Sequence, residues 1–307
     1  MLHAQKSDVT YPAWRPAVRE GFASRIKRIL SPGDDLPSGG RRAQVIAISN
    51  QKGGVGKTTT AVNLSAGLVL FHQKKVLLID LDAQGHVSVS LQRPFAENGS
   101  GISTILSAKN ASILDAVAPT EMENLDITLS DRSLIETEGQ LAAKIGREFI
   151  LRRALSRART YYDVVLIDCP PNLGNLTVNA YVASDRLIIP CELSALALEG
   201  MEGILDAIDT VQYRLNHPLK VLGILPTRVD HRNVTMNEAV FSRLRELFGD
   251  KLFKTQITVN TDLNKAQMLG KPIFQFAPGS TGAQNYQALA DEVVERIGWG
   301  AHPDSSC

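Results

Sequence analysis

The sequence predicts an α/β fold, in which helices cover both faces of a doubly wound, mostly parallel sheet. Short apolar runs alternate along the chain with segments whose apolar residues recur at helical spacing, an order typical of parallel strands joined by helical crossovers. The runs are apolar almost without interruption, as expected for strands that are buried on both faces of a sheet.

The first predicted unit is a strand at residues 45–49, a glycine-rich loop and a helix at 58–71. Further strands are predicted at the apolar runs 76–80, 125–129, 164–168, 187–190 and 221–225. Further helices are predicted at 147–159, 198–215, 235–248 and 282–297. The last of these helices is expected to be capped by Ser280 or Thr281 and to end at Gly298.

All of these elements fall in one predicted domain at residues 43–299. Residues 1–42 contain four prolines and a Ser-Gly-Gly run, and we interpret them as a short N-terminal extension. The extension carries eight Lys/Arg and four Asp/Glu, and its stretch 15–30 is basic and amphipathic. That stretch is compatible with a helix packed on the domain, a disordered tail, or a contact with nucleic acid or a membrane surface. Residues 300–307 are predicted to be a loose tail.

The composition favours a soluble protein of the cytoplasm. A chain of 307 residues with 44% hydrophobic residues can bury a sizeable core, and no apolar run approaches the length of a membrane span. The first 30 residues lack the apolar core of a signal peptide. Cys169, Cys191 and Cys307 are widely spaced and form no C-x-x-C pair, which argues against a structural zinc or iron–sulfur site.

The loop at residues 49–60 is the segment most informative about function, and it reads Ser-Asn-Gln-Lys-Gly-Gly-Val-Gly-Lys-Thr-Thr-Thr. Glycines allow successive backbone N–H groups to turn toward phosphate oxygens at a helix N-terminus. Lys57 is expected to neutralise the β- and γ-phosphates, Thr58 to bind Mg²⁺ and Thr59 to donate to the α-phosphate. The pattern predicts a P-loop nucleotide triphosphatase with ATP and Mg²⁺ as cofactors. Its loop positions are Gly53, Gly54, Val55 and Gly56.

A strict P-loop has glycine where this chain has Gln51, but the additional Lys52 explains the difference. Lys-Gly-Gly-Val-Gly-Lys-Thr-Thr resembles the deviant Walker A box of the ParA/MinD superfamily, and residues 49–59 resemble most closely the ParA/Soj-type chromosome and plasmid partition ATPases. The resemblance implies that Lys52 crosses a dimer interface and contacts the nucleotide of the partner. The alternative is a solvated loop lysine.

Two carboxylate segments extend the resemblance. Asp80 and Asp82 follow an apolar strand, at the end where open α/β sheets bind ligands. Their segment resembles the family's D-x-D-P-Q switch, with Ala83 in place of the usual proline. This implies that Asp82 orients the attacking water while Asp80 supports the Mg²⁺ shell, the alternative being that both only cap a loop. The run 164–168 ends in Asp168, which has the form of a Walker B aspartate and is expected to bind Mg²⁺ through water.

The resemblance continues through residues 223–232, 253–257 and 270–273, and therefore spans most of residues 45–297. In this family, the loop that contains the counterparts of Thr258 and Asn260 faces the adenine. In the family, this loop usually carries basic side chains at the positions that Val259 and Asp262 occupy here. Because this chain lacks those two basic side chains, the expectation of DNA contacts at these positions is weaker.

Residues 219–271 nonetheless hold nine Lys/Arg against five Asp/Glu. Positive charge gathered on one face binds DNA through its phosphates, without reading sequence. We therefore predict nonspecific DNA binding through Arg228, Arg232, Lys254 and Lys265.

Together these patterns predict a nucleoid-associated, cytoplasmic partition ATPase. The resemblance implies that ATP closes two copies of the chain into a dimer, that the dimer binds DNA, and that a ParB-like centromere-binding protein stimulates hydrolysis and release. One alternative is a MinD-like or cargo-positioning ATPase that acts at a membrane or protein surface. Residues 299–307 offer no amphipathic helix for this, so we expect no stable membrane association. A metabolic or reductase relative is disfavoured by the missing cysteine pair.

Overall fold

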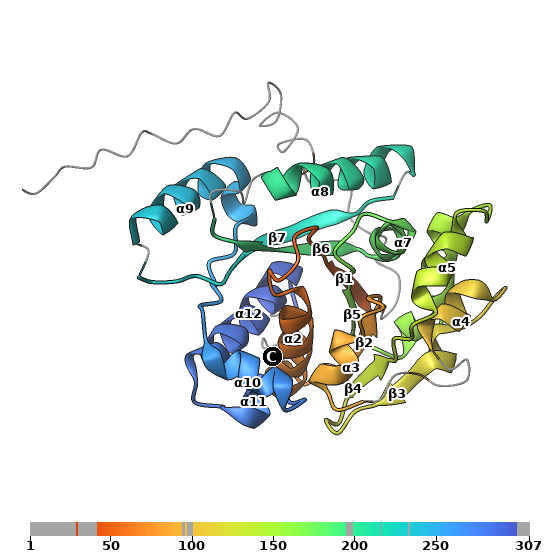
Figure 1. Cartoon of the computed structure of the whole chain (residues 1–307), viewed down its shortest axis with the longest axis horizontal. Coiled ribbons are helices and arrows are strands. Elements are labelled where there is room, and N and C mark those ends of the chain that lie inside the picture. The colour runs from red at the N-terminus through yellow and green to blue at the C-terminus, as the bar shows by residue number, and fades with distance from the viewer. Residues whose placement is uncertain are drawn as a thin grey trace, which may run out of the picture.

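The computed structural model describes residues 29, 42–93, 96, 101–194, 199–215, 217–232 and 234–299. Their strands form one seven-stranded sheet in the order β3-β4-β2-β5-β1-β6-β7, with helices on both faces (Figure 1). Every neighbouring pair is parallel except β3 and β4. The crossovers lead from β1, inside the sheet, to both of its edges, so the predicted doubly wound fold is confirmed.

The strands agree closely with the apolar runs of the sequence. β2 and β5 have the predicted bounds, whereas β6 and β7 are longer than predicted. The antiparallel edge strand β3 is not predicted, because three residues are too few to form a recognisable pattern. The strands are β1 Gln44–Ile48, β2 Val76–Asp80, β3 Val117–Pro119, β4 Leu125–Thr128, β5 Val164–Asp168, β6 Arg186–Glu192 and β7 Lys220–Thr227.

The longest predicted helices are present, and α12 begins after the cap Ser280 and ends at Gly298 as expected. The α-helices are α2 Lys57–His72, α3 His86–Ser90, α4 Ile102–Ser107, α5 Leu134–Leu141, α6 Ile150–Ala154, α7 Asn175–Ala183, α8 Glu199–Asp209, α9 Val234–Phe248, α10 Thr261–Met268, α11 Ile273–Phe276 and α12 Thr281–Ile297. Short 3₁₀ or π turns are η1 Ile113–Ala116, η2 Arg147–Phe149, η3 Ala158–Thr160, η4 Thr210–Arg214 and η5 Gly249–Lys251.

One predicted helix is divided, and one predicted loop is partly helical. The helix predicted at 147–159 is divided into η2, α6 and η3. The division was not predicted because the buried residues Leu151, Ala154 and Ala158 have the spacing of a continuous helix, and a series of tight turns can bury residues at the same spacing. The segment 258–265, predicted as a loop, becomes helical at Thr261, where α10 begins. No described helix has the combination of length and apolar composition that a membrane span requires.

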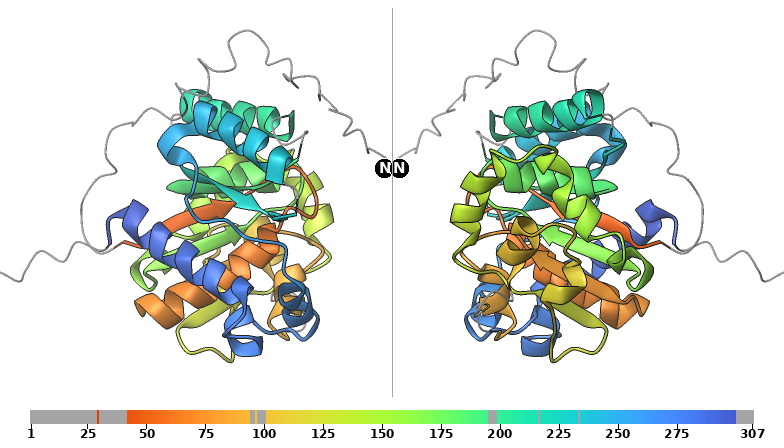
Figure 2. Two further views of the ribbon diagram at one scale, coloured as in Figure 1. Left: turned by 90° about the vertical axis from the view of Figure 1, so that its left-hand side faces the viewer. Right: turned by 90° about the vertical axis from the view of Figure 1, so that its right-hand side faces the viewer.

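The two faces of the sheet have separate cores, because side chains alternate along each strand. In β1, Ile46 packs with residues of α2 and α12, whereas Val45 packs with residues of α7 and α8. The views in Figure 2 show these helix layers on opposite sides of the sheet. Ile29, the one described residue of the basic stretch, is buried in the same core as Val45. The rest of the predicted extension and the predicted tail at 300–307 lie outside the described residues.

Candidate active site

Three neighbouring parallel strands have their carboxyl ends side by side, at one end of the sheet. β5 lies between β1 and β2, and its last residue, Asp168, is in register with Ile48 of β1 and Asp80 of β2. The glycine-rich loop follows β1 at that end and leads directly into α2 (Figure 1). The fold therefore brings together the three segments that the sequence singled out.

The loop has the backbone of an open cradle. Gly54 and Gly56 have φ angles of 74° and 89°, a left-handed region that side chains other than glycine adopt with strain. A Cβ atom at either position would meet no atom within 4 Å, so the space beside both glycines is open. Gly56 is also the N-cap of α2 and supplies no side-chain cap, which leaves the first N–H groups of the helix available to an anion.

Lys57 is buried beneath this cradle, and its Nζ donates to the carbonyl oxygen of Lys52 at 3.2 Å. Burial lowers the pKa of Lys57, and the negative charge of Asp168 acts in the opposite direction. A buried ammonium that lies on a loop carbonyl is poorly compensated. It would gain from a phosphate group seated above it.

Asp168 has one satisfied and one unsatisfied carboxylate oxygen. The hydroxyl of Thr58 donates to Oδ2 at 2.7 Å, whereas Oδ1 is buried without any hydrogen-bond partner. Burial raises the pKa of Asp168 to about 7, against the lowering effects of the Thr58 hydrogen bond and the Lys57 charge. A buried carboxylate oxygen without a partner requires an explanation, and a Mg²⁺ ion with its water shell would supply one.

These residues fit a magnesium ion that is held jointly by protein and phosphate. Within the described ranges, no group of three His, Cys, Asp or Glu side chains forms a self-contained metal site. Mg²⁺ is typically bound through one or two protein oxygens together with substrate phosphates and water. The Thr58 hydroxyl and the free oxygen of Asp168 provide that number of ligands next to the cradle.

Asp80 is fully buried and holds the loop that follows β2. Its two carboxylate oxygens accept the backbone N–H groups of Asp82 at 3.0 Å and Val87 at 3.3 Å. Burial and the neighbouring Asp168 raise the pKa of Asp80 well above its usual range. These contacts give Asp80 a clear part in holding the loop, whereas its support of a Mg²⁺ shell stays a prediction.

Asp82 lies in the same loop and is only partly buried. Its carboxylate accepts the N–H of Gln84 at 3.0 Å, and its carbonyl accepts the hydroxyl of Ser130 at 2.7 Å and the N–H of Gly85 at 2.9 Å. Ala83 therefore stands in a well-anchored turn without the usual proline. Its partial exposure leaves the Asp82 carboxylate within reach of solvent, and its water-orienting role stays a prediction.

Lys52 is held by a residue that the sequence analysis missed. Its Nζ forms an ion pair with Glu192, the last residue of β6. Arg228, predicted to bind DNA, lies in the same place: its Nε is 3.3 Å from Glu192, and its guanidinium donates to the Gly54 carbonyl at 3.4 Å. The signal available in the sequence was the position of Glu192 at the carboxyl end of a strand, where site residues of parallel sheets gather.

The two predicted adenine-facing residues lie at the same end of the sheet, beside the end of β7. Thr258 pairs with Val229 in a short parallel bridge, and its hydroxyl donates to the side chain of Asn285 at 2.9 Å. The side chain of Asn260 accepts the N–H of Asp262 at 2.7 Å and thereby caps α10. Both polar groups are already engaged within the protein, so their contact with a base stays a prediction.

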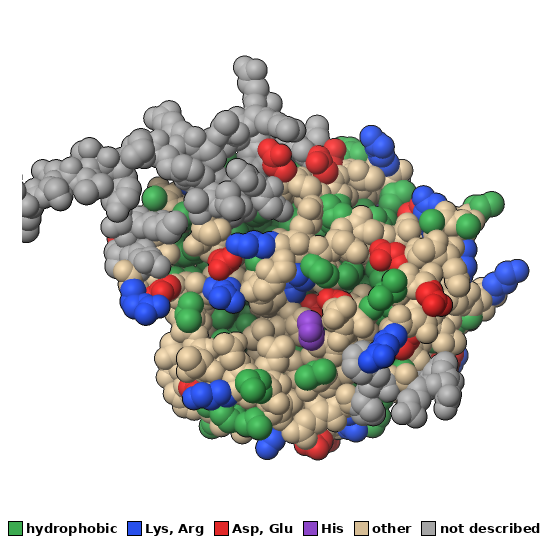
Figure 3. Space-filling model, viewed as in Figure 1, with side chains coloured by type: hydrophobic (Ala, Val, Ile, Leu, Met, Phe, Trp, Pro, Cys, Tyr) green, Lys and Arg blue, Asp and Glu red, His purple; other side chains and the backbone are tan. Residues whose placement is uncertain are grey.

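The four predicted DNA-binding residues do not form one free positive patch. Arg228 pairs with Glu192, Arg232 pairs with Asp230, and Lys265 pairs with Asp262. Lys254 has no ion-pair partner among the described residues. It lines a cavity beside β7, to which the glycine-rich loop contributes no residue. On the face drawn in Figure 3, positive and negative side chains are interspersed.

Comparisons with known proteins show the family to which the chain belongs. The family AAA_31, described as an AAA domain, matches residues 43–221. Over 251 residues the chain is 42% identical to the sporulation initiation inhibitor protein Soj of Bacillus subtilis, a match that covers 82% of this chain and 98% of Soj. Over 255 residues it is 39% identical to the chromosome partitioning protein ParA of Caulobacter vibrioides, covering 82% of this chain and 94% of that protein.

A solved structure shares the fold and the predicted ligands. Cobyrinic acid a,c-diamide synthase from Mycobacterium smegmatis, with a bound ATP analogue and magnesium, is 31% identical and has a TM-score of 0.72. The similarity covers 84% of this chain and 97% of that structure. Because Soj and the chromosome partitioning protein ParA are each matched over more than 90% of their length, and the family match spans more than half of the sequence, the chain belongs to the AAA_31 family and to its ParA/Soj-type partition ATPases.

Proposed function

We propose that this protein is a Mg-ATP-dependent partition ATPase that acts as a nucleotide-controlled switch. The observation that carries the proposal is the buried, unpartnered Oδ1 of Asp168 beside Thr58, at the mouth of an open glycine cradle. The solved structure of a relative with a bound ATP analogue and magnesium supports the choice of ligands. The relatives that carry the name of chromosome partitioning proteins support the process.

Each predicted residue then has a chemical task. The N–H groups of residues 53–56 and the hydroxyl of Thr59 bind phosphate oxygens, and Lys57 neutralises the charge of the transferred group. Thr58 and Asp168 hold Mg²⁺, which when bound neutralises phosphate charge. Asp82 orients the water, and Asp80 holds the loop on which Asp82 lies. Lys52 reaches the nucleotide of a second copy of the chain.

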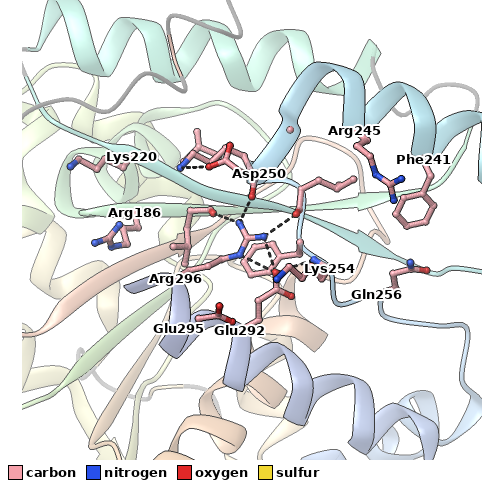
Figure 4. A pocket seen from close by; sticks show the side chains of 16 residues that line it. Arg186, Lys220, Phe241, Arg245, Asp250, Lys254, Gln256, Glu292, Glu295 and Arg296 are labelled. Atoms are coloured by element: carbon pink, nitrogen blue, oxygen red, sulfur yellow. Dashed lines mark hydrogen bonds and ion pairs between the residues drawn. The ribbon is translucent and has the colours of Figure 1, made fainter. Parts of the chain in front are cut away.

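The proposed output is a dimer that binds DNA nonspecifically, on the nucleoid in the cytoplasm, until a ParB-like partner stimulates hydrolysis. We assign the phosphate contacts to Lys254 and to Arg245, which is one of the nine basic residues of 219–271 but not one of the four predicted contacts. Both line a cavity of about 540 Å³ beside β7, together with Arg186 and Lys220 (Figure 4). Within the described residues, neither Lys254 nor Arg245 has an ion-pair partner, so their charge is available to phosphate.

The test is the binding of random duplex DNA with and without Mg-ATP, measured by gel shift. The Asp82→Ala variant should bind ATP, dimerise and remain on DNA because hydrolysis is slow, whereas Lys57→Ala should bind neither nucleotide nor DNA. Undiminished ATP affinity of Lys57→Ala would refute the nucleotide site. ATP-dependent dimers that do not bind DNA would refute the partition function, whereas the assignment of the nucleotide site would stand.

A second candidate function is the positioning of a protein cargo. Val259 stands where the family usually has a basic side chain, and it is exposed, as are Met268 and Leu269 at the other end of α10. Exposed apolar side chains favour a protein surface over phosphate as the partner of this helix. Mg-ATP-dependent dimers without DNA affinity in the gel shift would support this candidate.

A further inference from the structure

Glu192 forms ion pairs with two basic side chains from different parts of the chain. One carboxylate oxygen pairs with Nζ of Lys52 in the glycine-rich loop, and the other lies 3.3 Å from Nε of Arg228, just after β7. Glu192 itself ends β6 and is in register with Thr227 of β7. The contact therefore connects the loop after β1 with the ends of two neighbouring strands.

The surrounding backbone is arranged to keep Arg228 at this contact. Arg228 has a φ of 53°, a left-handed conformation that is uncommon outside glycine. Its guanidinium donates to the carbonyl of Gly54, and the hydroxyl of Thr227 donates to the carbonyl of Val55 at 2.9 Å. The end of β7 thus holds the cradle from outside and keeps the guanidinium beside Glu192.

The three side chains are accessible enough to exchange partners. The exposed fraction is 44% for Lys52, 27% for Glu192 and 58% for Arg228. Pairs of this exposure are modest in strength, because water competes for both charges. The ion pair can therefore hold Lys52 in its own subunit without preventing its release.

We infer that Glu192 and Arg228 are positioning residues that control when Lys52 becomes available to a second subunit. Glu192 holds Lys52 within its own subunit and competes with the nucleotide of the partner. Arg228 remains on Glu192 when Lys52 leaves, so the carboxylate is never left without a counter-charge next to an anionic nucleotide. This inference rests on the proposed ATP-dependent dimer.

The exchange predicts opposite effects for the two residues. Glu192→Gln keeps the shape and removes the charge, so Lys52 is released at lower cost and the dimer forms more readily. Arg228→Gln leaves Glu192 with Lys52 as its single cation, so the dimer forms less readily. Arg228→Lys keeps the charge and should behave like the parent. An exposed pair corresponds to about a threefold effect per subunit, hence about tenfold per dimer, in which two pairs break.

The experiment measures the dimer dissociation constant by analytical ultracentrifugation, at saturating Mg-ATP and in the Asp82→Ala background, which removes turnover. At low salt, Glu192→Gln should lower this constant about tenfold and Arg228→Gln should raise it about tenfold. Both effects should shrink in about 0.5 M salt, since exposed charges are screened. Glu246→Gln, which breaks the exposed pair with Arg243, is the matched control and should leave the constant unchanged.

Thermal unfolding of every variant checks that the fold is intact. The inference is overturned if Glu192→Gln dimerises no better than the parent, or if Glu192→Gln and Arg228→Gln shift the constant in the same direction, as a purely structural role would. Absence of ATP-dependent dimers in the Asp82→Ala parent overturns the proposed function as well. A dimerising parent with an unshifted Glu192→Gln variant overturns only the inference.

Discussion

At the scale of single residues, three residues of the candidate site are buried charges that lack full compensation. Asp80 and Asp168 are adjacent carboxylates in the interior, and burial raises the pKa of each. Lys57 is the buried cation opposite them, and burial lowers its pKa. Such an arrangement opposes folding in the absence of a ligand and is expected where a metal ion and phosphates supply the missing partners.

The first prediction is that Asp168→Asn changes the pH dependence of stability. The folded-state pKa of about 7 lies above the ordinary value of 3.8, so the folded protein binds this proton more tightly. The resulting destabilisation is absent below about pH 4 and complete above about pH 7. Between pH 4.5 and pH 8, Asp168→Asn should therefore gain about 2–3 kcal/mol of unfolding free energy relative to the parent.

Urea unfolding of nucleotide-free protein at the two pH values measures this gain, and the exposed Asp250→Asn is the control for the charge change. With Mg-ATP present, the order should reverse, because the parent is stabilised by its ligand. A constant difference between Asp168→Asn and the parent at both pH values would contradict the prediction.

The sequence could predict those residues of the candidate site that belong to short, continuous sequence patterns. Lys57, Thr58 and Asp168 each lie at a fixed position in a strand–loop or strand-end pattern, and the fold only has to bring the patterns together. The Glu192 contact joins residues 140 positions apart, and the Gly54–Arg228 contact spans 174 positions. Neither leaves a periodic trace in the sequence, so both required the structure.

The same distinction holds at the scale of whole elements. Strands buried on both faces and long amphipathic helices such as α12 were predicted, because their patterns are long. α7 was missed because it is buried nearly all round and shows no apolar stripe. α10 was missed because its cap, Asn260, was interpreted as part of a ligand-binding loop. Short helices and caps depend on tertiary context more than on periodicity.

One polar network fastens α12 to the edge of the sheet. Glu292 accepts the N–H groups of Lys254 and Thr255 at 2.9 and 2.8 Å, and it pairs with Arg296 at 2.7 Å. Arg296 also donates to carbonyls that include those of Leu222 and Leu252 (Figure 4). Burial alone would raise the pKa of Glu292, but the hydrogen bonds outweigh it and the pKa is lowered.

The second prediction is that Glu292→Gln destabilises the protein by about 1–3 kcal/mol, because the amide N–H₂ would face the N–H donors that the carboxylate now accepts. Glu295→Gln, exposed and less than one turn away on the same helix, is the matched control and should change stability by less than about 0.5 kcal/mol. Equal unfolding free energies for the two variants in urea at pH 7 would refute this role of Glu292.

At the scale of the whole molecule, charge is distributed rather than concentrated. The formal net charge is +1, and three of the four cations predicted to bind DNA pair with nearby carboxylates. Counting basic residues along the sequence predicted a positive region, but it could not show which charges are neutralised in the fold. Pairing an arginine with an aspartate two positions away, as in Arg232 and Asp230, reduces what it can offer to phosphate.

The last prediction concerns the surface that holds DNA in the ATP-bound dimer. Each free cation that contacts a phosphate contributes about 0.9 to the slope of log K against log salt on duplex DNA. Arg245→Gln and Lys254→Gln should each lower that slope by about this amount, or by about twice as much if both copies contact the duplex. Arg232→Gln and Lys265→Gln should lower it by less than half as much, since Asp230 and Asp262 already neutralise these side chains.

Binding to random duplex DNA is measured from 50 to 300 mM salt in the Asp82→Ala background, and the dimer constant is measured for every variant so that lost dimers are not taken for lost DNA contacts. Lys251→Gln is a useful comparison, because Lys251 lines the same cavity but lies 3.7 Å from Asp250, and its effect should therefore be intermediate. A larger change of slope for Arg232→Gln and Lys265→Gln than for Arg245→Gln and Lys254→Gln would show that DNA binding breaks the surface ion pairs. The DNA surface would then include Arg232 and Lys265, two of the four residues that the sequence predicted.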